Sequence, residues 1–173
     1  MGKKFEFKVI ELKRVAKAIE GGKRIKVRAV VVVGDLQGKV GIAVEKGDDI
    51  SIAVEKARRS AEKNAITVPI VDGTIPFDIQ YKFGASKILL KPANKGRGLI
   101  AGNVVRNILS LAGYTDVSAK ILGVTKNPLV NALATIKALE KLDKIYKRKI
   151  KLKESLKKEN ANSSDKVQIK EEK

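Results

Sequence analysis

The chain has 173 residues, and 37 Lys and Arg against 19 Asp and Glu give it a net charge of +18. A protein with this much positive charge attracts polyanions, because each phosphate that a cation neutralises releases condensed counterions. Nucleic acid is therefore the leading class of partner. The absence of Cys and His excludes disulfides, zinc clusters, thiolate nucleophiles and imidazole acid–base chemistry. We therefore expect no metal and no cofactor, and the length suggests two small domains.

A membrane is not indicated as a partner. No apolar run is long enough to span a bilayer, and the N-terminus has no apolar signal core. The start of the chain also lacks the Ser or Thr of a myristoylation site. The sequence predicts a soluble, cytoplasmic protein.

The range 5–19 is ambiguous. Its apolar residues fall at i, i+3, i+4 and i+7, and Gly21 could cap a helix that ends before it, so the local pattern favours a helix over a strand. These apolar residues are Leu12, Val15, Ala16 and Ile19.

The range 21–47 predicts a β-hairpin. β-branched residues occupy both arms, and the turn at 34–38 carries two Gly and one Asp. Alternation places Val27, Ala29, Val31 and Val33 on one face, which predicts a core face. The other face begins with cations, Lys26 and Arg28.

A helix follows, with Asp48 or Asp49 as its cap. Its predicted apolar stripe, at i, i+3, i+4, i+7 and i+11, is Ile50, Ala53, Val54, Ala57 and Ala61. On another side lie Lys56, Arg59 and Lys63.

The second half of the chain reads as β-β-β-α-β-α. Strands are predicted at 66–70, 78–83, 86–91 and 117–122, and helices begin near Ala101 and after Asn127. The fold class is therefore α+β, with two helices on one face of the second sheet. After about Asp143 the composition turns to Lys, Glu, Asn and Ser, which predicts a basic and largely disordered tail.

A glycine-rich stretch lies between a predicted strand and helix at 92–102. Its Gly residues would let the backbone approach an anion at a helix N-terminus. That anion could belong to a nucleotide, as in small-molecule kinases of the galactokinase type, or to RNA, and the loop could also be a plain tight turn. Leu99, Ile100 and Ala101 stand where the kinase loop usually has Ser, and neither Walker nor dinucleotide spacing is present.

A series of short motifs occurs in order over about residues 5–142. They are Arg14-Val15-Ala16-Lys17, Gly21-Gly22, Val32-Val33-Gly34-Asp35, Gly38, Val40-Gly41, Ala57-Arg58-Arg59, Gly73-Thr74-Ile75, Leu90-Lys91-Pro92-Ala93, Gly98-Leu99-Ile100-Ala101-Gly102, Arg106, Leu111-Ala112-Gly113, Asn127-Pro128 and Ala134-Thr135-Ile136. Together these motifs resemble the small-subunit ribosomal protein S5 family in its bacterial or plastid form.

The resemblance implies an N-terminal double-stranded-RNA-binding-like β-β-β-α domain at 5–65, a C-terminal domain at 66–142 with a left-handed βαβ crossover, and a tail at 143–173. It also implies that 10–17 is a strand paired with 26–33 across a loop at 18–25.

The family's properties imply the function expected here. Its members sit where the head of the small subunit meets the body, contact its RNA, and pack against proteins S4 and S8. Spectinomycin binds near the loop that matches 17–26. Gly102 and Arg106 match the contact with S4, which is linked to translational accuracy, although a helix start and a surface cation would explain them as well.

We expect rRNA binding, no small-molecule substrate and no enzymatic activity, with a plastid stroma as an alternative location. A kinase, or a double-stranded-RNA-binding protein acting off the ribosome, are the alternatives. Any single Lys in the set could also be a solvated surface charge. The expected RNA-binding residues are Lys17, Gly21, Gly22, Lys23, Arg24, Lys26, Arg28, Lys56, Arg59, Lys63, Lys95 and Arg97.

The chain departs from the family's pattern at three places. Val27 replaces a usual aromatic, which puts a stacking contact in doubt. The stretch 43–47 lacks the customary run of Gly, and Asn103 stands where a second Gly is usual.

Overall fold

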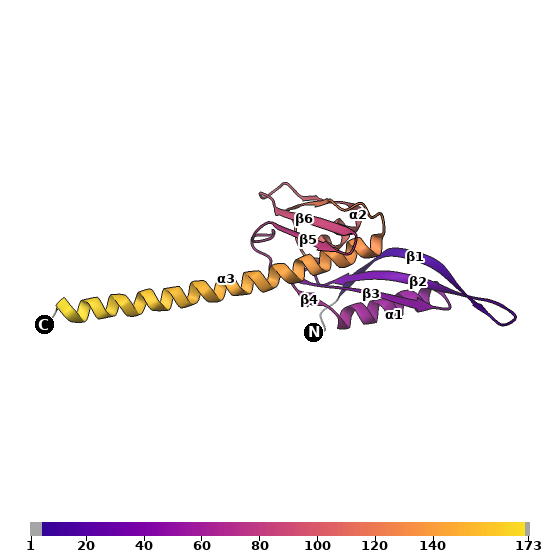
Figure 1. Ribbon diagram of the computed structural model, residues 1–173, viewed down its shortest axis with the longest axis horizontal. Helices are drawn as coiled ribbons and strands as arrows, with labels where there is room; N and C mark the ends of the chain where they lie inside the picture. Colours follow the sequence, from indigo (N-terminus) through magenta and orange to yellow (C-terminus); the bar gives the residue numbers. More distant parts are fainter. Residues whose placement is uncertain (1–4, 172–173) are drawn as a thin grey trace.

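The computed structural model describes the backbone of residues 5–171 and the side chains of residues 5–152. Its elements form four layers, with α1 (Ile50–Lys63) beneath the first sheet, α2 (Asn103–Ala112) and α3 (Pro128–Glu171) above it, and the second sheet on top (Figure 1). This arrangement confirms the predicted α+β class. The helices α2 and α3 are shared between the layers, because one apolar core joins Val32 of the first sheet to Leu139 of α3 and Ile88 of the second sheet.

The first sheet is antiparallel, in the order β1 (Glu6–Ile19), β2 (Gly22–Gly34), β3 (Lys39–Gly47) and β4 (Ile66–Thr67). The helix that the local pattern favoured at 5–19 is wrong, and the strand implied by the family is right. Pairing with β2 along nearly the whole strand overrides the helical spacing, and Leu12 and Ile19 remain 44% and 52% exposed.

The predicted core face of the hairpin is confirmed. Val31 and Val33 are fully buried against the alanines of α1, and small side chains there let the helix lie close to the sheet. Asp49 caps α1, its carboxylate accepting the N–H of Ile50 at 3.2 Å. The opposite face of β2 is buried too, because Val32 packs into the core shared with the second domain.

The second sheet has the order β5 (Ile79–Phe83), β6 (Ser86–Pro92), β8 (Val117–Ile121) and β7 (Leu99–Ile100). The short β7 was not predicted; it pairs in parallel with β8, and α2 connects the two. The βαβ unit is thus present, and its left-handedness stays a prediction. The strand predicted at 66–70 does not belong to this sheet, because β4 pairs with β3 in the first one.

The turn between β2 and β3 is held against the C-terminal end of α2. The N–H of Leu36 donates to the carbonyl of Leu111 at 3.1 Å, and a Cβ on Gly34 would lie 2.1 Å from that same oxygen. Only a residue without a side chain fits there, so the two domains meet through backbone contact.

The tail expected at 143–173 differs from the structure. The helix α3 continues to Glu171 instead of ending near Asp143. Ile145 packs against the shared core, and the ammonium of Lys149 lies 4.4 Å from the ring centroid of Phe77. The physical reason is that residues 143–171 contain no Gly or Pro and many strong helix formers.

Candidate nucleic-acid interface

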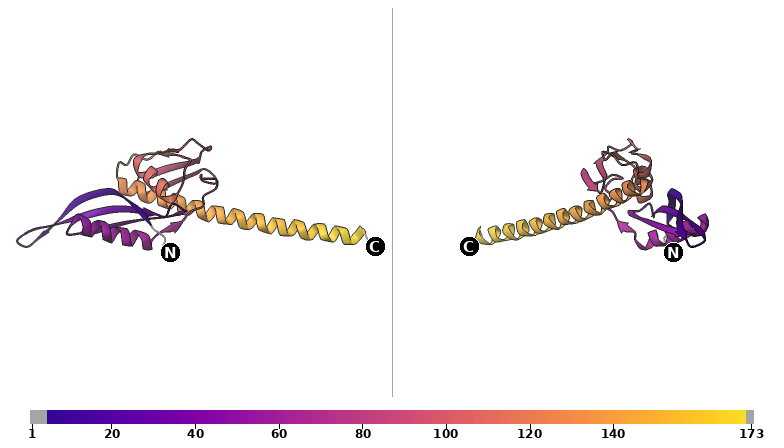
Figure 2. Two further views of the ribbon diagram at one scale, coloured as in Figure 1. Left: turned by 180° about the vertical axis from the view of Figure 1, so that it is seen from behind. Right: turned by 45° about the vertical axis from the view of Figure 1, so that its right-hand side comes forward.

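The arms of the β1–β2 hairpin stay paired to their last residues and extend past both cores, as the indigo strands show (Figures 1 and 2). Ile19 pairs with Gly22, which leaves Glu20 and Gly21 as the turn. Gly21 has φ of 84°, a conformation that favours glycine. The loop predicted at 18–25 is therefore a paired hairpin with a two-residue turn.

One face of this hairpin gathers cations, because residues directly opposite each other in an antiparallel pair point to the same side. Lys17 lies opposite Arg24, and Arg28 lies opposite both Lys13 and Lys46. We call this surface the hairpin cationic face, and it comprises Lys13, Lys17, Arg24, Lys26, Arg28 and Lys46.

Lys13 and Lys46 were absent from the predicted set. The missing signal was strand register, which decides the side to which each residue points. Knowing that β1 is a strand would have supplied Lys13. Lys46 also required the alignment of β3 with β2.

Two carboxylates orient these cations. Glu11 contacts Lys13 at 2.8 Å and Arg28 at 3.0 Å. The hydrogen bond from Lys13, followed by the charge of Lys13 and contact with Arg28, holds the pKa of the Glu11 carboxyl below its ordinary value of 4.5. Glu11 therefore stays ionised and fixes part of the charged face.

The second carboxylate, Asp48, lies nearer the tip. It contacts Lys26 at 3.2 Å and Arg24 at 3.9 Å. The hydrogen bond from Lys26 holds the pKa of Asp48 below its ordinary value of 3.8. Lys17 and Lys46 have no carboxylate partner in the described part of the chain, so their charge is available to an external anion.

A shallow groove of 260 Å³ runs along this face. Cations and short apolar side chains line it together, which suits a sugar-phosphate backbone better than a small polar metabolite. The lining residues are Val15, Ala16, Lys17, Arg24, Lys26 and Lys46.

The structure does not bring the whole predicted RNA-binding set together. Lys23 pairs with Ala18 and points to the opposite side of the hairpin from Arg24. On α1, which covers that opposite side of the sheet, Arg59 contacts Glu55 at 3.0 Å. The other two predicted residues of α1, Lys56 and Lys63, are exposed on the same helix.

The glycine-rich loop carries Lys95 and Arg97, both exposed. The carboxylate of Asp116 accepts the backbone N–H of Gly98 at 2.8 Å and the hydroxyl of Thr115 at 2.9 Å. The Gly98 N–H and then the Thr115 hydroxyl hold the pKa of Asp116 below its ordinary value. An internal anion thus occupies the donor that a phosphate would need, which argues against a nucleotide loop.

Gly102 and Arg106 lie one helical turn apart at the start of α2. The N–H of Arg106 donates to the carbonyl of Gly102 at 2.8 Å, and both residues are exposed. A Cβ on Gly102 would lie 3.3 Å from Cδ1 of Ile121. The two predicted interface residues therefore form one small surface, apart from the hairpin.

Within the described residues, no three or more His, Cys, Asp or Glu side chains gather as metal ligands. Over the same residues, no helix combines the length and apolar character that crossing a membrane requires.

Comparison with known proteins gives a family. Residues 5–69 match "Ribosomal protein S5, N-terminal domain", and residues 81–152 match "Ribosomal protein S5, C-terminal domain". "Small ribosomal subunit protein uS5" of Thermus thermophilus is 49% identical over 138 residues, which cover 80% of this chain and 85% of that protein. The protein of the same name from Thermotoga neapolitana is 45% identical over 138 residues, covering 80% and 77%. The chain therefore belongs to the ribosomal protein S5 family.

Proposed function

We propose that the chain is a structural constituent of the small ribosomal subunit and binds rRNA at the junction of head and body. The names of its relatives support the first part, since they are small-subunit proteins. The observation that carries the RNA contact is the hairpin cationic face, where five cations lie on one side of the two projecting strands β1 and β2 and a sixth, Lys46, lies beside them on β3.

The hairpin cationic face recognises the charge and shape of the RNA backbone and not its base sequence. Arg24, Lys26 and Arg28 alternate along β2, so they recur about every 7 Å and can follow a backbone. Lys and Arg on phosphates position a protein without reading sequence. With Val27 in place of an aromatic, this part of the hairpin offers no stacking platform for a base.

Protein contacts complete the proposal. Gly102 and Arg106 form the contact with protein S4 and through it contribute to translational accuracy, while protein S8 is a further neighbour. Spectinomycin binds near the hairpin tip. The exposure of Gly102 and Arg106, one turn apart on α2, supports a protein contact there.

The test neutralises the hairpin while a matched variant removes equal charge elsewhere. We expect K17Q/R24Q/K26Q to lose incorporation into small subunits, and its residual association to fail at lower salt than the wild type. The control K82Q/K87Q/K120Q removes three exposed cations from the outer face of the second sheet. Sedimentation of cell extracts at moderate and high salt provides the measurement.

Equal behaviour of the two variants would show that only net charge matters and would end the proposal for this face. The kinase alternative is tested by titration with ATP and Mg²⁺, where we expect no saturable binding. Protein found mainly outside small-subunit fractions would favour a double-stranded-RNA-binding protein that acts off the ribosome.

A further inference from the structure

A second row of cations runs along α3. They are spaced four, three, four and three residues apart, which places them on one face of the helix. All five are exposed. We call this row the α3 stripe, and it comprises Lys137, Lys141, Lys144, Arg148 and Lys151.

The stripe is a solvent-facing surface of fixed length. The buried residues of the same helix, Ala138, Leu139 and Leu142, point into the shared core and hold the helix against the second sheet. At 1.5 Å per residue, the stripe spans about 21 Å. The cations are therefore held in a line by packing on the other side of the helix.

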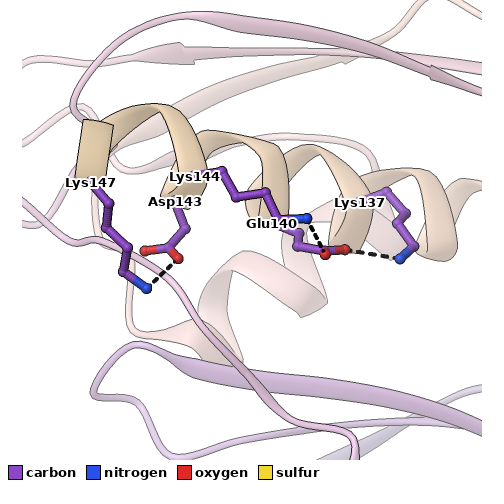
Figure 3. A network of polar contacts seen from close by, with 5 residues as sticks. All are labelled: Lys137, Glu140, Asp143, Lys144 and Lys147. Carbon is purple, nitrogen blue, oxygen red and sulfur yellow. Dashed lines mark hydrogen bonds and ion pairs between the residues drawn. The ribbon is translucent and has the colours of Figure 1, made fainter. Parts of the chain in front are cut away.

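Acidic residues do not cancel this row. Glu140 accepts hydrogen bonds from Lys137 and Lys144, each at 2.9 Å, and Asp143 binds Lys147, which lies beside the stripe (Figure 3). The two Glu140 contacts hold Lys137 and Lys144 of the stripe in place.

The rest of the row lacks such partners. Within the described residues, Lys141, Arg148 and Lys151 have no carboxylate partner. Three of the five stripe cations are therefore available to an external anion.

The aromatic ring of Tyr81, beside the stripe, already contacts a stripe cation. Tyr81 forms a groove of 390 Å³ with residues of the stripe and Glu140. The ammonium of Lys141 lies 5.5 Å from the Tyr81 ring centroid, a cation–π contact. Single-stranded nucleic acid is usually bound by free aromatic faces on which bases stack. Because Lys141 already contacts this ring, the row of cations favours the phosphate backbone of a duplex over a stacked base.

We propose that the α3 stripe binds the phosphate backbone of an RNA duplex, as a second RNA contact of this chain. The hairpin tip and the C-terminal part of α3 leave the body in opposite directions (Figures 1 and 2). The chain would thus contact RNA through two separate elements, the β1–β2 hairpin and α3. This contact does not depend on the hairpin cationic face.

The experiment measures binding of the full chain to an RNA duplex of about 20 base pairs, long enough for the stripe, over a salt series. We expect K141Q/R148Q/K151Q to lower affinity about tenfold or more at 0.1 M salt. The slope of log K against log salt should fall by about 2 to 3, one contact for each cation removed. The charge-preserving K141R/R148K/K151R should bind like the wild type.

Two matched variants separate the possible outcomes. K82Q/K87Q/K120Q removes the same charge from the outer sheet face, and we expect it to change the slope by less than half as much. K17Q/R24Q/K26Q tests the hairpin in the same assay, so a loss confined to that variant would support the hairpin contact and overturn the stripe. Circular dichroism and thermal unfolding of every variant report whether it is folded.

The proposal is overturned if the stripe variant binds the duplex like the wild type, or if it and the sheet control lose affinity equally. It is also overturned if the stripe variant keeps its affinity for RNA and loses association with a ribosomal protein, since the partner would then be an acidic protein surface.

Discussion

The carboxylate of Asp116 accepts the backbone N–H of Gly98 at 2.8 Å, and this contact orders the glycine-rich loop from within. Asp116 is only 7% exposed and directly precedes β8, so the segment that enters the second sheet supplies the anion. A loop built to hold phosphate leaves such donors free for a ligand. Here the internal contact orders the loop, and Lys95 and Arg97 remain exposed on it.

The Asp116 contact predicts a pH-dependent loss of stability. Because its pKa is held below the ordinary value of 3.8, this carboxylate contributes stability that is complete above that value. The contribution is lost as the pH falls through the lowered pKa of the folded state. We expect Asp116→Asn to lower the urea midpoint at pH 7 and to lessen its further fall between pH 5 and pH 3.

Urea unfolding at both pH values, followed by circular dichroism, measures this difference. Asp78→Asn removes an exposed carboxylate just before β5 and serves as the control. Parallel pH profiles for the wild type and Asp116→Asn would contradict the assignment.

Adding one methyl group at Gly113 is expected to lower the free energy of unfolding strongly. Its φ is 95°, and a Cβ there would lie 2.2 Å from the carbonyl oxygen of Leu36. Gly96 has a similar φ of 84° but open space around its Cβ position. We expect Gly96→Ala to cost about 1 kcal/mol from backbone strain alone.

Gly113→Ala should cost about 1–3 kcal/mol more than Gly96→Ala, because the domains must also separate locally. Chemical denaturation of both variants gives the two free energies of unfolding. Equal losses would mean that the close contact of α2 with the β2–β3 turn does not constrain the domains.

Removing the charge of Asp48 is expected to strengthen RNA binding. It contacts Lys26 and Arg24, so its charge competes with phosphate for both cations. We expect Asp48→Asn to raise RNA affinity about threefold at 0.1 M salt and to steepen the salt dependence. Asp78→Asn makes the same change in net charge away from the hairpin and should have a smaller effect.

Anisotropy titrations with labelled RNA measure both variants. An Asp48→Asn chain that binds no better than Asp78→Asn would show that Lys26 and Arg24 do not contact the RNA.

Removing the charge of Arg106 is expected to change decoding accuracy without changing the stability of the fold. The side chain is exposed at the first turn of α2, so Arg106→Gln should leave the free energy of unfolding within about 0.5 kcal/mol of the wild type. If it contacts protein S4, the variant weakens that association and raises misreading. A reporter for stop-codon readthrough measures this, with Lys82→Gln as the control. Unchanged readthrough would remove Arg106 from the accuracy interface.

Several elements could be predicted from local sequence because their own side chains carry the signal. The alternation of Val27, Ala29, Val31 and Val33 identified the core face of β2. The apolar stripe predicted for α1 identified its buried side at Ala53, Val54, Ala57 and Ala61, but it was wrong at Ile50, which is 51% exposed at the first turn of the helix. The range 5–19 could not be assigned in the same way. Its residues fit a helix and become a strand through pairing with β2, a contact between different parts of the chain.

The interface was likewise predictable only in part. Basic charge near the paired Gly residues pointed to the hairpin, but its cations separate into two faces according to strand register. That register joined Lys46 to Arg28 and removed Lys23 from the set. Likewise, the Gly spacing near Gly98 resembled a phosphate loop until folding brought Asp116 to it.

The sequence by itself determined that the chain is strongly cationic, without thiol or imidazole chemistry, and built of mixed helices and strands of the S5 family. These properties depend on which residues are present and on their spacing over a few positions. Tertiary structure alone decided which cations share a surface, which backbone donors stay free, and where β4 pairs. Those outcomes depend on contacts between residues far apart in the chain, whose geometry exists only after the sheets and helices have packed.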